Sequence, residues 1–307
     1  MRARLLEFTE DEKWAVLKHE DCTEEELDEL IERIKEWIIK TNLPVEENPS
    51  NKYRTALLNC KLSLERTKEC LRGYYHIRTL YSDFFDKLVP NTNTYNLAKE
   101  LVTVAILPKL TPDLCRTTCV RIDDPQGQAP DGLFYEVIPI LHTELRIVTE
   151  DYFVSNIIVI DLEGFGLKNV IKYTPTVNNM LVHLMISINL RLKGLHFINA
   201  PPIMDKVMFL VRSCLPTKFL DKVHVHKNAD TLYKFVPKEC LPENYGGQLP
   251  SLEQLHEDWC IASESQEEFF KKLQTVKCDK DELAELKIQN NDSGFGVDGS
   301  FKKLAID

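Results

Sequence analysis

The sequence lacks most of the features that mark secreted, membrane-spanning or fibrous proteins. Among its 307 residues there are only 11 glycines and 15 prolines, and 43% are hydrophobic, which is typical of a globular protein with a sizeable core. No run of about 18 apolar residues occurs without a charge, so no membrane-spanning helix is expected. The first residues contain no apolar run of the length that a signal peptide needs. Nine scattered cysteines, an odd number, then predict free buried thiols in a cytoplasmic protein.

Catalytic motifs are also scarce. The segment Gly-Phe-Gly at 164–166 is only half of a dinucleotide-binding fingerprint, and there is no phosphate loop, nucleophile elbow or His-Glu-x-x-His helix. His224 and His226 share one face of an expected strand, but no further metal ligand lies near them in the sequence. Asp161 and Glu163 end another strand without a nucleophile or metal ligand beside them, which favours structural hydrogen bonding. The sequence therefore predicts a protein that is not an enzyme and that holds no metal or cofactor.

Charge is distributed unevenly along the chain. The formal net charge is −10, and residues 1–50 hold 15 acidic against 7 basic residues. Residues 191–228 reverse this balance, with seven bases against Asp205 and Asp221. The bases are Arg191, Lys193, Lys206, Arg212, Lys218, Lys222 and Lys227. This segment is either a solvated face or the contact face for an anionic partner, and the acidic remainder gives no reason to expect nucleic acid.

Residues 1–98 are expected to form a small all-helical lobe. The segment 22–44 has Thr23 as its N-cap and a glutamate three residues later, which is the arrangement of a capping box. Apolar residues at helical spacing follow on one face. A second long helix is predicted over 63–85.

Residues 99–262 are expected to form an α/β domain, because short strand-like runs alternate with helical segments. The expected strands are 114–122, 155–164, 194–200 and 222–226, and the expected helices are 133–148, 174–189 and 203–213. Such alternation requires crossover connections, which predicts a mainly parallel sheet. Residues 263–307 are expected to be an acidic tail with one short helix near 267–273.

Two of these helical segments, 133–148 and 180–192, are apolar around most of their circumference. A helix of this kind must be buried on several sides. The pattern leaves two interpretations open: an ordinary core, or the wall of a cavity that holds an apolar ligand.

Three segments occur in an order and spacing that resemble one known family. They are VIDLEGFGLKNVIKYTPTV (159–177), LKGLHFINAPPIMDKVMFLVRSCLPTKFLDKVHVH (192–226) and KECLPENYGG (238–247). Together they resemble the CRAL-TRIO family of intracellular lipid-transfer proteins, in the branch of α-tocopherol transfer protein and cellular retinaldehyde-binding protein. The end of the chain, GVDGSFKKLAID (296–307), is similar to the tail of insect members of that branch.

The resemblance implies a sheet of about five strands and a lipophilic pocket. Thr143 and Pro139 stand where the tocopherol carrier has two serines near the polar head of its ligand. His183 is either a polar contact in the pocket or a core histidine with satisfied hydrogen bonds. The implied pocket residues are Phe134, Ile138, Pro139, Thr143, Ile160, Phe165, Leu181, His183, Leu184, Ile188 and Leu195.

The resemblance also implies a mobile gate helix within Asn199–Lys222, after the Ile-Asn-Ala-Pro-Pro turn. Pro201 and Pro202 stiffen its hinge, because proline cannot continue a helix. The gate has an apolar face that can cover the ligand when closed and enter a bilayer when open. Its residues are Ile203, Met204, Val207, Met208, Val211 and Leu215.

The basic segment acquires a role from the same resemblance, since cations beside the gate of related proteins hold phosphoinositide headgroups. The matching residues are Arg191, Lys193, Arg212, Lys218 and Lys222. Each cation near an anionic membrane contributes roughly 1 kcal/mol. Leu58 and Asn59 stand where relatives carry an arginine, so the resemblance supports contact with anionic membranes more than specific phosphoinositide recognition.

The expected function is that of a monomeric cytoplasmic carrier that associates peripherally with membranes during transfer. Its cargo would be an isoprenoid-type lipid of the tocopherol, retinoid or carotenoid class. The alternative is a phospholipid or phosphoinositide sensor or scaffold of the same fold, which a polar, cationic pocket would favour. An enzyme on a parallel sheet is the third hypothesis, and no motif supports it.

Overall fold

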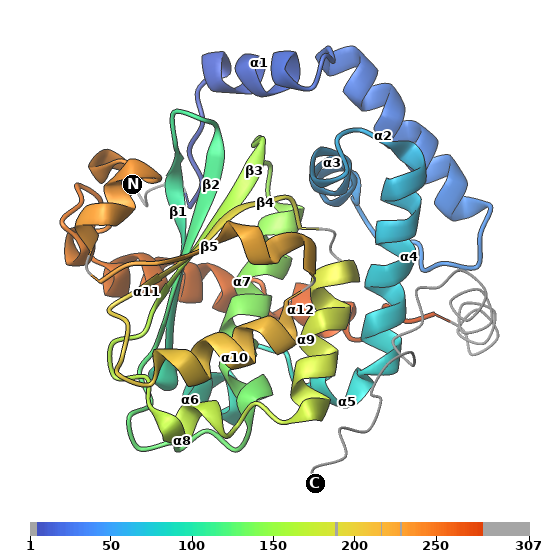
Figure 1. Cartoon of the computed structure of the whole chain (residues 1–307). Helices are drawn as coiled ribbons and strands as arrows, with labels where there is room; N and C mark the ends of the chain where they lie inside the picture. The colour runs from blue at the N-terminus through green and yellow to red at the C-terminus, as the bar shows by residue number, and fades with distance from the viewer. Residues whose placement is uncertain (1–4, 188–189, 216, 228, 279–307) are drawn as a thin grey trace, which may run out of the picture.

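The centre of the computed structural model, which describes residues 5–187, 190–215, 217–227 and 229–278, is one sheet. Its five strands are, in spatial order, β1 (Val102–Leu110), β2 (Cys115–Ile122), β3 (Ser155–Asp161), β4 (Leu192–Ile198) and β5 (Val223–Val225). β1 pairs antiparallel with β2, and the other three pairs are parallel. The prediction of a mainly parallel sheet of about five strands, flanked by helices, is confirmed (Figure 1).

The helices that follow the strands cover the sheet. They are α7 (Val137–Val148), α8 (Leu167–Val170), α9 (Pro175–Ser187), α10 (Met204–Cys214) and α11 (Leu252–Glu264). α11 packs along the edge strand β1 and contacts α7, while α10 contacts α8 and α9. The last helix, α12 (Glu267–Leu273), matches the short helix expected near 267–273.

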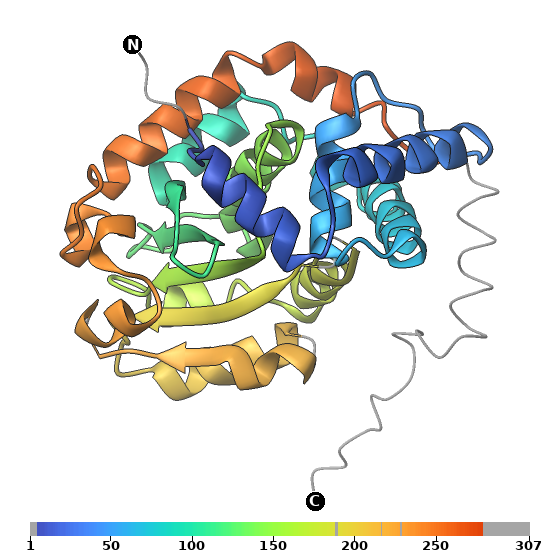
Figure 2. The same ribbon diagram turned by 90° about the horizontal axis from the view of Figure 1, so that it is seen from above.

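The N-terminal part is helical, as expected. It contains α1 (Glu10–His19), α2 (Glu24–Ile39), α3 (Ser50–Asn59), α4 (Leu64–Leu80), α5 (Ser82–Phe85) and α6 (Asn93–Leu101). The predicted capping box at Thr23 and Glu26 is present at the start of α2. α3 packs against α7, and α4 packs against α9, so these helices stand on the side of the sheet where α7 and α9 lie (Figure 1, Figure 2).

The helix expected over 133–148 is divided in the structure. Gly132–Glu136 form a 3-10 helix, η1, and α7 begins at Val137. The side chain of Asp131 accepts a hydrogen bond from the Phe134 amide and caps η1. Pro139 is tolerated because it lies in the first turn of α7, where no intrahelical N–H bond is lost. Further 3-10 helices are η2 (Thr217–Lys222), η3 (Ala229–Lys234), η4 (Lys238–Cys240) and η5 (Glu243–Tyr245).

Three other expectations have clear outcomes. Eight of the nine cysteines, all except Cys214, whose side chain is not described, are free thiols, and seven of these eight are buried, as predicted. Within the described ranges no helix has both the length and the apolar character needed to cross a bilayer. The resemblance of 296–307 to insect proteins falls on residues outside those described, and the boundaries at 98/99 and 262/263 stay predictions.

Candidate functional site

A hydrophobic cavity of about 400 Å³ lies between the sheet and the helices α4, α7, α9 and α10. Its volume falls within the roughly 300–1,000 Å³ that is usual for ligand sites. Both apolar segments singled out in the sequence, 133–148 and 180–192, contribute to its wall. For these helices the cavity-wall interpretation describes the structure better than an ordinary core does.

The floor of the cavity follows from strand alternation. Successive side chains of a strand point to opposite faces of the sheet. Ile158 and Ile160 of β3 line the cavity and stay half-buried, whereas Ile157 and Val159 on the opposite face are almost fully buried. In-register neighbours from β2, among them Thr118 opposite Ile158, extend the floor. The partial burial of Ile158 and Ile160 reflects their exposure to the cavity.

Most of the residues implied for the pocket lie on the cavity wall. These are Pro139, Thr143, Ile160, Phe165, Leu181, Leu184 and Leu195. Phe134 and Ile138 lie instead in the core that surrounds the cavity. Ile188 lies outside the described residues.

His183 is not on the cavity wall either. Its Nδ1 lies 2.8 Å from the hydroxyl oxygen of Tyr81, at the contact of α9 with the N-terminal helices. Of the two interpretations of His183, the structure matches the one in which its hydrogen bonding is satisfied within the protein.

The expected gate corresponds to α10. Val207, Val211 and Leu215 face the cavity at helical spacing, and Leu210, which the sequence analysis did not name, joins them. The other three predicted gate residues are absent from the wall: Ile203 and Met204 pack against the surrounding core, and Met208 is half-buried. Fewer of the predicted gate residues therefore face the cavity than expected.

The turn before α10 is held by a buried carboxylate. Asn199 has a positive φ of 52°, a conformation that asparagine tolerates better than most residues. Its side-chain amide donates to Oδ1 of Asp161 (2.8 Å), which also accepts from the Glu163 amide (2.9 Å). The predicted structural role of Asp161 is confirmed, and the carboxylate fixes the turn before α10.

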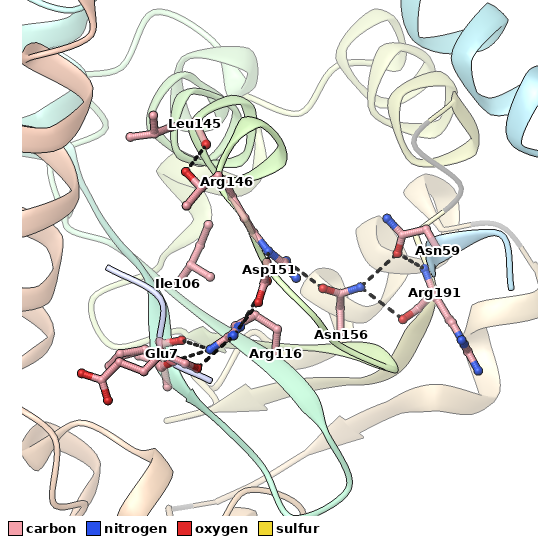
Figure 3. A network of polar contacts seen from close by, with 12 residues as sticks. Glu7, Asn59, Ile106, Arg116, Leu145, Arg146, Asp151, Asn156 and Arg191 are labelled. Carbon is pink, nitrogen blue, oxygen red and sulfur yellow. Dashed lines mark hydrogen bonds and ion pairs between the residues drawn. The ribbon is translucent and has the colours of Figure 1, made fainter. Parts of the chain in front are cut away.

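A buried ion-pair network, drawn in Figure 3, borders the cavity through Arg146 and Asn156. Asp151 accepts hydrogen bonds from Arg116 (Nη2, 2.5 Å) and from Arg146 (Nε, 3.1 Å). Arg116 and Asp151 are completely buried, and Arg116 also donates to the carbonyls of Leu107, Pro108 and Glu7. The network ties β2 to the end of α7.

Asn156 continues this network toward the N-terminal helices. Its side-chain oxygen accepts from Nη1 of Arg146 (2.8 Å), and its amide donates to the side-chain oxygen of Asn59 (3.3 Å). Asn59 also accepts from the Arg191 amide (3.4 Å), as Figure 3 shows. Asn59, at a position where relatives carry an arginine, is thus a neutral residue of the cavity wall.

Four charged residues line the cavity among the residues described: Lys52, Glu136, Glu144 and Arg146. Three are paired within the protein, Lys52 with Glu46, Glu144 with Arg78, and Arg146 with Asp151. Glu136 differs, because its half-buried side chain forms no hydrogen bond or ion pair with any described residue. Burial raises the pKa of Glu136 to about 7. The sequence analysis missed this residue, although it is the one acid within the apolar run LFYEVIPIL.

Two of the five predicted cations beside α10 form ion pairs within the protein. Arg191 pairs with Glu20 (2.5 Å), and Lys193 pairs with Asp113 (2.5 Å). Lys222 donates to the carbonyl of Leu192 (2.6 Å). Arg212 is exposed and forms no ion pair with the described residues, while the side chain of Lys218 lies outside the description. The role of Arg191, Lys193, Arg212, Lys218 and Lys222 in membrane contact stays a prediction.

One group of described side chains has the composition of a metal site. His142 of α7 and His256 and Cys260 of α11 are buried, with their ligand atoms within 4.8 Å of one another. The group lies outside the cavity wall, and Nδ1 of His256 already lies 3.1 Å from the carbonyl oxygen of Val104. Burial raises the pKa of Cys260 to about 12, so the thiol stays protonated. Because Sγ of Cys260 lies 3.5 Å from Nε2 of His256, these groups contact one another, and we interpret them as a polar cluster of the core.

The two histidines of the β5 region belong to a stacked cluster. Nδ1 of His196 lies 2.9 Å from Nε2 of His226, and the rings of His196 and His224 stack at 4.9 Å. Burial lowers the pKa of His196 to about 3, which keeps it neutral. This stacked arrangement agrees with the interpretation in which His224 and His226 are polar residues of the strand region and do not share a metal ion.

Comparison with known proteins matches residues 140–247 to the CRAL/TRIO domain. The chain is similar to the alpha-tocopherol transfer protein-like protein of Homo sapiens, with 24% identity over 204 residues, which covers 63% of this chain and 57% of that protein. The Mus musculus protein of the same name is 24% identical over 225 residues (69% and 62%). Clavesin-1 of Xenopus laevis is 26% identical over 122 residues (38% and 37%). The matches thus span less than two thirds of these relatives.

Among solved structures, the crystal structure of Sfh5 aligns with 94% of this chain and 100% of its own, at 12% identity and a TM-score of 0.44.

Proposed function

We propose that this chain, which belongs to the CRAL/TRIO family through residues 140–247, is a non-enzymatic carrier that shields one isoprenoid-type lipid in its cavity and moves it between membranes. The observation that carries the proposal is the hydrocarbon-lined space of about 400 Å³ beside α10. Filling it with a hydrocarbon chain removes apolar surface from water on both partners, at about 25 cal/mol per Å². Such a site favours cargo with a long apolar body and a small polar end.

The charges of the wall support this cargo over a phospholipid. A phospholipid headgroup needs free cations for its phosphate. Lys52 and Arg146 are the cations among the described wall residues, and each already has an acidic partner in Glu46 or Asp151. The phospholipid sensor therefore gains no support from the described part of the wall.

Transfer between membranes requires α10 to close over the lipid with an apolar inner face. We expect the double variant Val207→Asp/Val211→Asp to transfer a retinoid between liposomes at least about tenfold more slowly than the wild type, since an aspartate in an apolar site is strongly disfavoured. The measurement is the rate of retinol transfer from donor to acceptor vesicles, followed by energy-transfer quenching.

The matched control is Val45→Asp, the same change at a residue that is 70% exposed. Its transfer rate should equal that of the wild type, and both variants should keep the far-ultraviolet circular dichroism of the native chain. An unchanged rate in the double variant, or no transfer by the wild-type protein, would count against the carrier function.

The outer side of the gate offers a surface for membrane contact. Leu167, Ile171 and Phe209 are 49%, 66% and 77% exposed, and they come from α8, its end and α10, which pack together. Lys206 and Arg212 flank Phe209 at a spacing of three residues on α10, and both are exposed. An apolar patch with adjacent cations suits the interface of an anionic bilayer.

Replacement of Phe209 by serine should weaken binding to anionic vesicles by about ten- to a hundredfold, because inserting one large apolar side chain contributes about 1.5–3 kcal/mol. Co-sedimentation with phosphatidylserine-containing vesicles measures the effect. The control is Trp14→Ser, which removes an aromatic residue that is 62% exposed on α1. Equal losses in the two variants would argue against a specific docking surface at the gate.

A further inference from the structure

Glu136 differs from the other charged residues of the described cavity wall, because it has no partner within the described protein. The other three charged wall residues, Lys52, Glu144 and Arg146, are neutralised inside the protein by ion pairs of 2.5–3.1 Å. Glu136 forms no such contact with any residue in the described ranges. A half-buried carboxyl group in a wall of hydrocarbon loses part of its hydration, so a polar partner from outside the chain would stabilise it.

Glu136 and Arg146 lie at different positions along the cavity wall. Glu136 is the last residue of η1, directly before α7, and Arg146 lies ten residues further along α7. At a rise of 1.5 Å per residue the two positions are about 15 Å apart. The Arg146 end of the cavity is occupied by the network of Asp151 and Asn156. The Glu136 end is therefore the end at which a polar group of the ligand can be recognised.

Tyr135, which is next to Glu136 in the sequence, does not form a hydrogen bond with it. The hydroxyl of Tyr135 donates to Asp124 (2.8 Å) and accepts from Asn169 (3.0 Å), so it is committed elsewhere. The hydroxyl of Thr143, one of the two positions compared with serines, donates to the carbonyl of Pro139 within its own helix (2.8 Å). Neither group competes with a ligand for the carboxyl.

We propose that Glu136 anchors the polar end of the lipid and selects an alcohol over a carboxylic acid of the same carbon skeleton. This inference rests on the proposed carrier function and narrows its cargo. A carboxyl group can accept a hydrogen bond from a hydroxyl and, when protonated, donate one to it. A second carboxylate at the same place would meet a like charge in a site of low polarity.

The state of Glu136 agrees with this role. Because burial raises its pKa to about 7, a large share of the carboxyl is neutral near physiological pH. A neutral carboxyl beside a neutral alcohol leaves no uncompensated charge in the cavity. No ionised partner is then needed to complete the site.

The experiment compares phytol, phytanic acid and phytane, which share one branched hydrocarbon skeleton and differ at its end. Each competes with retinol, whose fluorescence reports occupancy, in the full-length protein at pH 8. This pH lies above the pKa of Glu136, so the carboxylate accepts a hydrogen bond from the alcohol and repels the ionised acid. The wild type should bind phytol about 10- to 100-fold more tightly than phytanic acid. In Glu136→Gln the affinity for phytanic acid should rise and the affinity for phytol should fall, so that the two affinities differ by no more than about threefold.

The control is Glu100→Gln, an exposed acid of α6 outside the cavity wall, which should keep the wild-type ratio. Glu136→Gln removes a buried carboxyl, so thermal unfolding should show a midpoint no lower than that of the wild type. Equal ratios in wild type and Glu136→Gln would overturn the role of Glu136 while leaving the carrier function intact. Failure of the wild type to bind retinol and all three competitors would overturn both.

Discussion

The variant Asp151→Ala should lose about 3–5 kcal/mol of unfolding free energy, the usual cost of removing one partner of a buried ion pair. Asp151 and Arg116 are completely buried, and Arg146 is 8% exposed, so the substitution leaves two guanidinium groups without their counter-charge. Burial already lowers the pKa of Arg146 against the opposing effect of Asp151. Urea unfolding followed by tryptophan fluorescence measures the loss.

Asp113→Ala is the matched comparison, because Asp113 pairs with Lys193 at a similar distance of 2.5 Å but at the surface. Exposed ion pairs are usually worth less than about 1 kcal/mol. The loss of unfolding free energy should therefore be several-fold larger for Asp151→Ala than for Asp113→Ala. A loss for Asp151→Ala no greater than that for Asp113→Ala would contradict the assignment of Asp151 as the counter-ion of the network.

The second large effect concerns the cavity itself. The double variant Ile160→Trp/Leu184→Trp should reduce lipid affinity by more than about a hundredfold, because two indole groups would occupy space that the hydrocarbon chain requires. Both wall residues are half-buried and come from β3 and α9. The substituted side chains would extend into open space, so the midpoint of thermal unfolding should change little.

Ile157→Trp provides the contrast on the same strand. Ile157 is 2% exposed on the opposite face of β3, where no cavity exists to receive a larger side chain. Overpacking there should cost about 1–3 kcal/mol while lipid affinity remains. Reversal of the two results, with lipid binding lost only in Ile157→Trp, would show that the ligand lies elsewhere.

Much of the fold could be predicted because each element carried a local signal. The capping box at Thr23, the apolar helices and the strand β3 all follow from residues close together in the sequence. The strand Val102–Leu110 was missed because nearly all of its residues are buried, so it lacks the alternation that identifies a half-buried strand. The helix Glu10–His19 had a usable signal in Thr9 and Glu12, which form a second capping box.

The candidate site was harder to predict than the fold. The family resemblance indicated α10 as the gate, and Val207 and Val211 do face the cavity. The ion pair of Arg191 with Glu20 joins residues 171 positions apart, and no local pattern reports such a contact. Glu136 carried a signal, an acid within an apolar run, but only the coordinates place it on the cavity wall without a partner.

Mass spectrometry of organic extracts from purified full-length protein tests the central proposal most directly. The wild type is expected to retain close to one equivalent of an isoprenoid alcohol, and Ile160→Trp/Leu184→Trp, prepared in parallel, is expected to retain almost none. An extract of the wild type without lipid, or equal lipid in both proteins, would contradict a hydrocarbon-lined carrier site behind α10.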